Sequence, residues 1–412
     1  MIQAATTCRS CGAGALTPVL DLGVTPLANR LLEAHELNAA EPRYPLRVAF
    51  CRSCALVQLT DTVPPEQLFR EYVYLSSFSD TVVDNARRIV ERVLAEKLVA
   101  PGRGLVIELA SNDGYLLQHY RRAGVAVLGI EPAGNIARIA RQRHGIETVN
   151  DFFTADLATR LARDGRRADV LHANNVLAHV ADLNGFVRGI ATVLAPRGTA
   201  LIEVPYLKDL IDHVEFDTIY HEHLCYFSLT ALESLFARHG LVIADVQRLA
   251  IHGGSLRLWV MHAEAATRGR AVDAMLDDEA RQGMRDAAYY QRFSQRVAAL
   301  GDEVRAMLGR LRAAGKRIAV YGASAKGSTL QNYLGIGRET VEFVADRSTV
   351  KQGRFTPGTH LPIVAAEALT ERMPDYTLLL SWNFRDEILA QQQTYRQRGG
   401  RFIVPIPKVE VV

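Results

Sequence analysis

The stretch Leu105-Val-Ile-Glu-Leu-Ala-Ser-Asn-Asp-Gly114 predicts the fold class of the largest part of the chain. Its first half is an apolar run typical of a buried strand, and its second half has the composition of a turn. A helix is expected next, at 115–123, and a second strand at 125–130. Further strands are expected at 168–173 and 198–204, with a helix at 183–194 between them. This alternation predicts a doubly wound, parallel, Rossmann-like α/β sheet that binds ligands at the carboxyl ends of its strands.

The turn after the first strand is not a dinucleotide fingerprint, because it has one glycine and acidic side chains where a pyrophosphate would lie. Carboxylates at this place suit a nucleoside that carries a cationic sulfonium. Glu131 ends the second strand and is expected to bind the two ribose hydroxyls, and Asp151 and Phe152 are expected to recognise an adenine. A loop with solvated acids is the alternative. The predicted cofactor-binding residues are Glu108, Ala110, Asn112, Gly114, Glu131, Asp151, Phe152 and Asn174.

A second unusual segment is Tyr220-His-Glu-His-Leu-Cys-Tyr-Phe-Ser228, which places two histidines, a carboxylate and a phenol in consecutive positions. Histidine is suited to abstract a proton near neutral pH, and a neighbouring tyrosine or carboxylate can set its tautomer. The spacing H-E-x-x-H is absent, which excludes a helical zinc protease site. Thr230-Ala-Leu-Glu233 is expected to form the capping box of the helix that follows. A hydrogen-bonded histidine pair that only braces a loop is the alternative.

Four of the five cysteines form two C-x-x-C pairs near the start of the chain, Cys8 with Cys11 and Cys51 with Cys54. Four thiolates in two close pairs can complete a tetrahedral zinc site with no open position, so the metal is expected to be structural. Residues 12–50 form an insert between the pairs. Free buried cysteines are the alternative, and neither pair opens a helix after a strand, as a thioredoxin-like motif would. The fifth cysteine, Cys225, has no expected role.

The C-terminal region predicts a second, smaller Rossmann-like unit. Residues 268–314 have the composition of one or two long helices that bridge the units. Strands are expected at 316–321, 341–346, 376–381 and 401–405, and a helix at 328–333. The turn Gly322-Ala-Ser-Ala-Lys-Gly327 is not a P-loop, but its small residues and its lysine suit a diphosphate at a helix N-terminus. A structural duplicate with an empty turn is the alternative.

Composition sets the broad class of protein. A length of 412 residues predicts two to four domains, and 48% apolar and 23% charged residues are typical of a globular chain. The net charge of +3 argues against nucleic acid as a partner. We read neither a signal peptide nor an apolar run of about 20 residues, so we expect a cytoplasmic protein without a membrane partner. The expected domains are 1–75, 76–265 and 266–412.

Together these motifs resemble the sugar C-methyltransferase family of deoxysugar biosynthesis. The resemblance covers nearly the whole chain and is most specific in the Y-H-E-H segment. It implies a zinc-containing enzyme that uses S-adenosylmethionine to methylate the carbon beside the ketone of a nucleotide-linked keto-sugar. The implied substrate is a dTDP-linked 4-keto-deoxysugar, methylated at C3, in branched deoxysugar and antibiotic biosynthesis. The chain departs from the family at Ala110, where glycine is usual.

The resemblance also implies roles for individual residues. His223 would be the general base, supported by Tyr220 and Glu222, with His179 and Tyr74 completing the pocket. The residues implied for the nucleotide part of the substrate are Ser324, Lys326, Asp346, Trp382 and Asn383. It leaves the oligomeric state open, and a monomer is compatible with the sequence.

Two other functions compete with this interpretation. One is an NAD(P)-dependent oxidoreductase acting on a nucleotide-sugar, although neither α/β unit carries G-x-G-x-x-G. The other is a zinc module that reads nucleic acid through Arg9 and Arg52, for which two arginines are weak support.

Overall fold

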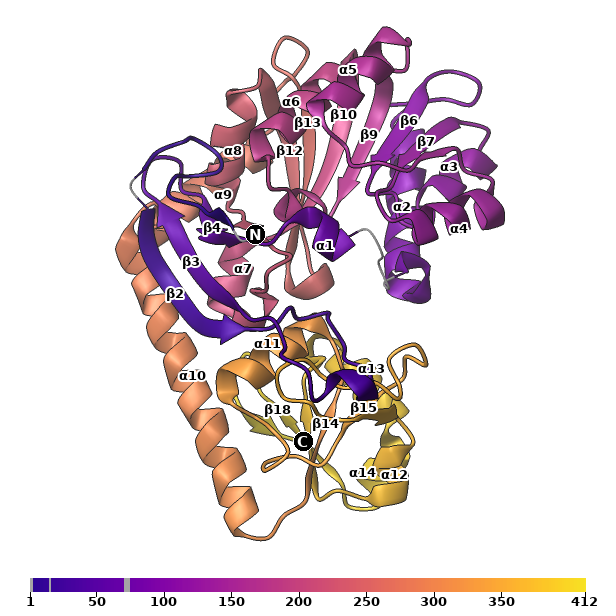
Figure 1. Cartoon of the computed structure of the whole chain (residues 1–412). Helices are drawn as coiled ribbons and strands as arrows, with labels where there is room; N and C mark the ends of the chain where they lie inside the picture. The colour runs from indigo at the N-terminus through magenta and orange to yellow at the C-terminus, as the bar shows by residue number, and fades with distance from the viewer. Residues whose placement is uncertain (1–2, 15, 70–74) are drawn as a thin grey trace.

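The computed structural model describes residues 3–14, 16–69 and 75–412 and divides them among three main sheets (Figure 1). The central sheet lies at the top of the view and the C-terminal sheet at the bottom. The indigo N-terminal strands and the long orange helix α10 (Ala287–Ala313) run along one side of both (Figure 1). The predicted fold class is confirmed: a cysteine-rich N-terminal module and two Rossmann-like units.

The N-terminal module is antiparallel. It contains β1 (Gln3–Ala4), β2 (Leu16–Thr25), η1 (Ala34–Glu36), β3 (Tyr44–Cys51), β4 (Val57–Leu59) and β5 (Asp61–Thr62). β1 pairs with β5, and the larger sheet has the order β11–β4–β3–β2. Its edge strand β11 (Cys225–Tyr226) comes from the segment that directly follows the Y-H-E-H motif. The module therefore pairs by main-chain hydrogen bonds with the region that carries the predicted base.

A connecting region and the first half of the central unit follow. Their elements are α1 (Pro65–Phe69), η2 (Ser76–Phe78), α2 (Asp80–Ala95), β6 (Leu105–Leu109), α3 (Leu117–Arg122), β7 (Ala126–Ile130), α4 (Gly134–His144), β8 (Thr148–Val149), α5 (Ala155–Arg163) and β9 (Ala168–Asn174). β6 lies between β7 and β9, and all three are parallel. This is the point where the strand order reverses, the usual ligand position of a doubly wound sheet.

The second half of the central unit comprises η3 (Leu177–His179), α6 (Leu183–Val193), β10 (Leu194–Pro205), α7 (Leu207–Asp212), η4 (Phe216–Thr218), α8 (Leu229–Ala237), β12 (Leu241–Leu249), η5 (Ile251–Gly253) and β13 (Ser255–His262). The sheet has the order β12–β13–β10–β9–β6–β7–β8. β13 is antiparallel to both β10 and β12. The prediction of a purely parallel sheet is therefore wrong at this edge, because β12 and β13 form a hairpin.

The C-terminal part contains α9 (Arg270–Gln282), α10, β14 (Ile318–Tyr321), α11 (Ala325–Leu334), β15 (Val344–Asp346), β16 (Ile363–Ala365), α12 (Ala368–Arg372), β17 (Tyr376–Leu379), η6 (Trp382–Phe384), α13 (Arg385–Gln391), α14 (Gln393–Gln397), β18 (Arg401–Val404) and β19 (Glu410–Val411). Its sheet has the order β16–β15–β14–β17–β18–β19, parallel except for β19. β14 lies between β15 and β17, so this unit also has a reversal point.

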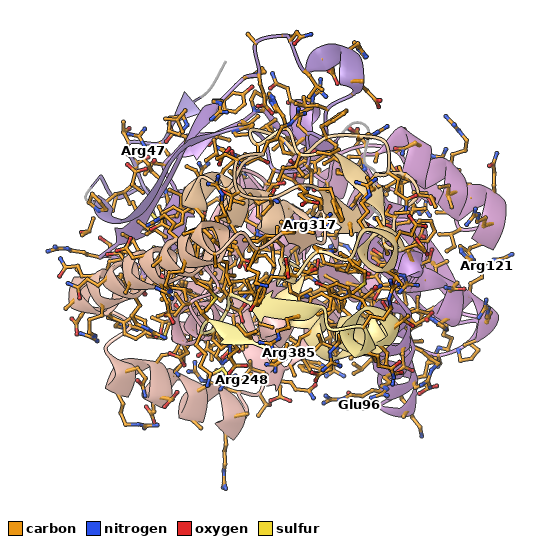
Figure 2. All side chains as sticks on the ribbon, turned by 90° about the horizontal axis from the view of Figure 1, so that it is seen from below. Arg47, Glu96, Arg121, Arg248, Arg317 and Arg385 are labelled. Carbon is orange, nitrogen blue, oxygen red and sulfur yellow. The ribbon has the colours of Figure 1, made fainter. Side chains whose placement is uncertain are left out.

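One apolar core runs through all three sheets. It includes Phe50 of β3, Ile107 of β6 and Val320 of β14, each 0% exposed. The ring of Phe50 packs on Tyr290 of α10, with the ring centroids 4.4 Å apart. Charged side chains such as Arg47, Glu96 and Arg121 extend outward from the ribbon (Figure 2). The module and the two Rossmann-like units are therefore joined by buried surface, since the same apolar cluster crosses their boundaries.

Candidate active site

The carboxylate of Glu131 is fixed at the end of β7 by the loop that follows β6. Its Oε2 accepts a hydrogen bond from the backbone N–H of Asn112 at 2.9 Å, and its Oε1 accepts one from the backbone N–H of Ala133 at 2.9 Å. Burial raises the pKa of Glu131, and these two hydrogen bonds oppose the rise. Each oxygen keeps a second lone pair, so the group can still accept hydrogen bonds from two ligand hydroxyls.

Glu108 provides a second acid at this edge. It is 1% exposed, and its Oε2 has no hydrogen-bond partner in the described part of the chain. Burial, with Asp113 and Glu131 nearby, raises the pKa of Glu108 well above its usual range. Tyr115 bonds to Glu108 and accepts a hydrogen bond from Asn174 at 3.5 Å. A buried acid with one oxygen that has no partner among the described residues suits a cationic or hydroxyl-bearing ligand. Tyr115 was not predicted; its position after Gly114 was the available signal.

The loop that carries these groups has an unusual backbone. Ala110, Asn112 and Gly114 have positive φ angles of 52°, 48° and 83°. The angle at Ala110 explains why glycine suits this position, since a Cβ there costs roughly 1–2 kcal/mol. At Gly114 a Cβ would lie 2.4 Å from Cδ1 of Ile146. We expected Gly114 to admit a ligand, whereas the structure gives an internal packing reason.

Other predicted cofactor residues lie at the same edge. Asp151 is exposed and Phe152 is half-buried just after β8. The backbone N–H of Ser76 donates to Oδ1 of Asn112 at 2.9 Å, so the η2 segment rests on the cofactor loop. Tyr74 lies outside the described residues, and its role stays a prediction.

His223 and Tyr220 form a hydrogen-bonded pair that sets the tautomer of the histidine. Nδ1 of His223 lies 2.8 Å from the carbonyl oxygen of Thr218. Because a carbonyl only accepts, this nitrogen carries the proton. Nε2 lies 2.9 Å from the hydroxyl of Tyr220, which donates to it. The neutral imidazole therefore presents Nε2 as its basic nitrogen, the arrangement that a general base needs.

His179 lies beside this pair, and Glu222 precedes His223 in the chain. The ring centroid of His179 is 4.8 Å from that of His223. Burial lowers the pKa of His179 to about 4, so its ring is neutral at neutral pH. Glu222 is 4% exposed, and burial raises its pKa to about 7. His221 points elsewhere: its Nε2 donates to the carbonyl oxygens of Tyr44 and Pro45 at 3.3 and 3.2 Å, which makes it a bracing residue of the loop.

The predicted capping box after the motif is wrong. Ser228 is the N-cap of α8, and its hydroxyl oxygen accepts from the backbone N–H of Ala231 at 3.1 Å. Thr230 instead donates its hydroxyl to Glu279 of α9, at 2.6 Å. The same carboxylate accepts from the backbone N–H of Leu229 at 2.7 Å. The helix thus begins earlier than we predicted, because Glu279 and Ser228 satisfy its first N–H groups.

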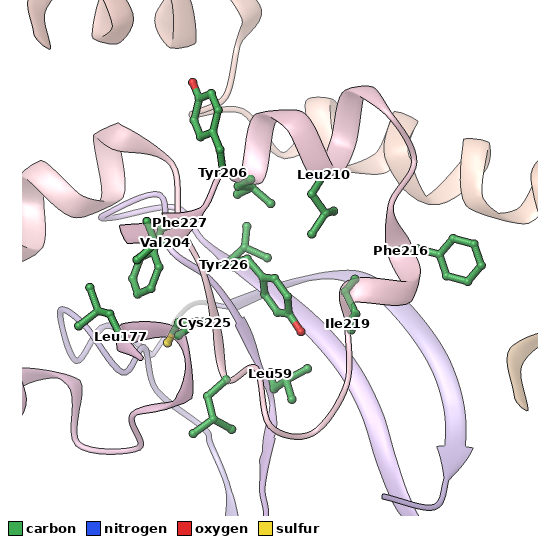
Figure 3. Close-up of a cluster of buried hydrophobic side chains, with 14 of the residues drawn as sticks. Leu59, Leu177, Val204, Tyr206, Leu210, Phe216, Ile219, Cys225, Tyr226 and Phe227 are labelled. Carbon is green, nitrogen blue, oxygen red and sulfur yellow. The ribbon is translucent and has the colours of Figure 1, made fainter. Parts of the chain in front are cut away.

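Cys225 belongs to the apolar support under the motif. It lies among Leu59, Leu177 and Tyr226 in the cluster that joins β11 to the N-terminal module (Figure 3). Cys225 is 1% exposed, and burial raises the pKa of its thiol to about 12. It therefore behaves as a small core residue.

The four cysteines of the N-terminal module form one cluster. The sulfurs of Cys8, Cys11, Cys51 and Cys54 all lie within 4.8 Å of one another. The Cys8–Cys54 and Cys11–Cys51 sulfurs are 3.5 and 3.6 Å apart. Tetrahedral zinc with Zn–S bonds of about 2.3 Å needs sulfurs about 3.8 Å apart, so the cluster fits zinc. Four thiolates leave no open position, which makes the site structural.

The predicted substrate residues of the C-terminal unit also converge. Ser324 follows β14 and caps α11, accepting from the backbone N–H of Gly327 at 3.1 Å. Asp346 ends β15 and accepts from the backbone N–H of Ala323 at 2.7 Å. Trp382 and Asn383 follow β17. The structure therefore brings the ends of β14, β15 and β17 together at the reversal point of this sheet.

Lys326 is the cation of this edge. Its Nζ is buried, has no hydrogen-bond partner among the described residues, and lies 4.7 Å from the ring centroid of Trp382. Lys326 lowers the pKa of Asp217, against the larger effect of burial. The indole N–H of Trp382 donates to Oδ2 of Asp217 at 2.7 Å. An ammonium without a partner favours an anionic ligand. Because the indole N–H is already bonded to Asp217, the predicted contact of Trp382 with the nucleotide part of the substrate stays a prediction.

Three family models cover most of the chain. A methyltransferase domain model matches residues 82–246, a C-methyltransferase C-terminal domain model matches 250–407, and a zinc binding domain model matches 8–69. With the acidic strand ends and the four-cysteine cluster, they define an S-adenosylmethionine-dependent methyltransferase with a structural zinc site.

One relative covers nearly the whole chain. The C-methyltransferase NovU of Streptomyces niveus is 37% identical over 406 residues, 98% of this chain and 96% of that protein. The chain belongs to this C-methyltransferase family, which confirms the resemblance to sugar C-methyltransferases. It also decides in favour of a methyltransferase over an NAD(P)-dependent oxidoreductase. A ubiquinone biosynthesis O-methyltransferase of Azorhizobium caulinodans is 32% identical over 25% of this chain and 41% of that protein.

Solved structures of other methyltransferases match more distantly. Magnesium protoporphyrin IX methyltransferase of Synechocystis with bound SAM is 15% identical, with a TM-score of 0.33 over 43% of this chain and 78% of that chain.

The described residues contain no helix with the length and apolar character that crossing a membrane requires.

Proposed function

We propose that this C-methyltransferase acts on a nucleotide-linked 4-keto-deoxysugar. It removes a proton from the carbon beside the ketone and methylates that carbon, at C3, in branched deoxysugar and antibiotic biosynthesis. The proposed carrier is thymidine diphosphate. The observation that supports the proposal most is the His223–Tyr220 pair, in which the hydrogen bond to Thr218 leaves Nε2 as the basic nitrogen.

A proton beside a ketone is removed easily only if the base is placed on it and the enolate oxygen meets hydrogen-bond donors. Nε2 of His223 would take the proton once the hydroxyl of Tyr220, which donates to Nε2 in this structure, turns to the enolate oxygen. The hydroxyl of Tyr220 and the neutral ring of His179 are the nearby groups that can face the enolate. Glu222 would stabilise the imidazolium that forms on His223, since a carboxylate favours a neighbouring cation.

S-adenosylmethionine, when bound at the β6–β7 edge, supplies an electrophilic methyl group. Glu131 would hold its ribose, and Glu108, Asn112 and Asn174 would line the remainder of that site. Positioning the acceptor carbon in line with the methyl supplies much of the rate.

The nucleotide part of the substrate would lie at the ends of β14, β15 and β17. Lys326 and the N-terminus of α11 suit the diphosphate, because the ammonium has no hydrogen-bond partner among the described residues and a helix N-terminus favours an anion. The hydroxyl of Thr329 in α11 donates to the carbonyl oxygen of Ile219, at 3.1 Å. This unit therefore packs directly against the segment that leads into the catalytic loop, so one substrate could reach both. We propose the domain division 1–75, 76–265 and 266–412 on the same basis.

Proton exchange in deuterated water tests the proposal. The enzyme, without methyl donor, is incubated with dTDP- and GDP-linked 4-keto sugars, and deuterium beside the ketone is measured by NMR. We expect exchange at C3 of a dTDP-linked sugar with the wild type and none with His223→Asn. Exchange by His223→Asn at the wild-type rate would contradict the assignment of the base, and absence of exchange on every sugar would contradict the substrate class.

A further inference from the structure

A side chain of the N-terminal module reaches the catalytic loop. Nδ2 of Asn29 donates to Oε1 of Glu222 at 2.6 Å. Asn29 lies in the insert between the two cysteine pairs, and Glu222 lies in the Y-H-E-H motif. No local pattern in the sequence pointed to Asn29.

The insert that carries Asn29 is held by the C-terminal unit. Leu32 and Phe355 exchange two backbone hydrogen bonds, of 2.9 and 2.8 Å. Glu33 pairs with Arg354 at 3.0 Å. Beyond them, both carboxylate oxygens of Glu41 accept from the backbone N–H of Gly358, at 3.0 Å. These contacts anchor the chain shortly after Asn29, so the position of its amide depends on tertiary structure.

The surroundings of Glu222 make this one hydrogen bond important. The carboxylate is buried, and its Oε2 has no hydrogen-bond partner in the described residues. The titratable residues nearest to it in the chain are Tyr220, His221 and His223. From η3, His179 contacts the ring of His223 and the backbone of Glu222. Burial raises the pKa of Glu222, and the hydrogen bond from Asn29 lowers it. Asn29, which lies outside the loop, therefore favours the charged carboxylate.

We propose that Asn29 is a positioning residue of the active site, whose amide group holds the carboxylate of Glu222 in one orientation within the Y-H-E-H loop. The inference rests on the proposed function in one respect, that Glu222 supports the base. Through Asn29, the zinc-binding module contributes to proton transfer in addition to folding its own segment.

Infrared titration of the Glu222 carboxyl group tests this inference without any substrate. The signal of Glu222 is isolated by subtracting spectra of Glu222→Gln, and its midpoint is measured in the wild type and in Asn29→Ala, Asn29→Asp and Arg30→Ala. A hydrogen bond to a charged group is worth about 1.5–3 kcal/mol, so we expect the midpoint to rise by about one pH unit in Asn29→Ala. Asn29→Asp should raise it further, since it keeps the size but places a second carboxylate there. Arg30→Ala, the adjacent control, should match the wild type.

The pH dependence of kcat/KM provides the functional readout. The acidic limb of the profile should move upward in Asn29→Ala by the same amount as the infrared midpoint, with the rate recovering at higher pH. An infrared midpoint within about half a unit of the wild type, or a rate lowered equally at every pH, would overturn the inference. Failure of the wild type to methylate any nucleotide-linked keto-sugar would instead contradict the proposed function, because the infrared titration does not require turnover.

Discussion

The two Rossmann-like units carry different side chains at the reversal points of their sheets. In the central unit, the ends of β6 and β7 carry the buried acids Glu108 and Glu131. In the C-terminal unit, Asp346 ends β15, and Lys326 in the first turn of α11 adds an ammonium that has no hydrogen-bond partner among the described residues. The acids suit a cationic nucleoside, and the lysine suits a phosphate.

In such a unit, the fold determines where the ligand-binding edge lies, and the loops determine the chemistry of that edge. In both sheets, parallel strands on either side of a reversal point bring loop residues to one edge. The chemistry of the edge then depends on a few side chains. The Y-H-E-H segment contributes none of these side chains, which allows its proposed role to be tested separately from binding.

The largest expected effect comes from His223→Asn. We expect kcat to fall by about 10²–10⁴-fold, as for loss of a general base, while the dissociation constants of both ligands change less than about twofold. Single-turnover kinetics and calorimetry with S-adenosylhomocysteine and dTDP measure these quantities. The exposed His35→Asn serves as control and should keep the wild-type rate. A loss of affinity at either edge comparable to the loss of kcat would show that the loop belongs to that edge.

Cys51→Ser should have the next largest effect, on stability. Loss of one thiolate opens the zinc site, and we expect zinc content to fall and the melting temperature to drop by more than about 5 °C, since 1 kcal/mol corresponds to roughly 2–4 °C in large domains. Cys225→Ser, which leaves the metal ligands in place, is the matched control and should keep its zinc. Metal analysis and calorimetry measure both. A zinc-free protein that melts at the wild-type temperature would contradict a structural metal.

Most of the fold could be predicted because its signals are local. The apolar run 105–109, the turn with Gly114 and the alternation that follows predicted β6, β7, β9, β10 and α6 within a few residues. In the C-terminal unit, β14, β15, β17 and β18 were predicted in the same way, whereas β16 and β19 were not. The antiparallel hairpin of β12 and β13 was missed, since pairing direction leaves no local pattern. The start of α8 was misplaced because Glu279, far along the chain, supplies part of the cap.

The structure groups the predicted cofactor, catalytic and substrate residues at the β6–β7 edge, in the Y-H-E-H segment and at the ends of β14, β15 and β17. The hydrogen-bond partners of these residues could not be predicted. The tautomer of His223 depends on the carbonyl of Thr218. Asn29 reaches Glu222 from the N-terminal insert, and Trp382 reaches Asp217 from the other unit. Such contacts depend on packing between distant segments. A single sequence does not show which of its polar residues will meet.

A smaller effect is expected from Ala110→Gly, which changes the cofactor edge without changing its charge. Glycine tolerates a φ of 52°, so the substitution should stabilise the protein by roughly 1 kcal/mol. Affinity for S-adenosylhomocysteine should stay within about twofold. Chemical denaturation measures the first quantity and calorimetry the second. Destabilisation by Ala110→Gly would contradict a strained alanine at this position.

The comparison of the two edges is tested most directly by a cross-titration. Glu131→Gln and Lys326→Met are each titrated with S-adenosylhomocysteine and with dTDP. We expect Glu131→Gln to weaken S-adenosylhomocysteine by about tenfold or more and to leave dTDP within about twofold, and Lys326→Met to do the reverse, as for loss of one charged hydrogen bond. Equal weakening of both ligands by either variant would contradict the assignment of separate ligands to the two edges.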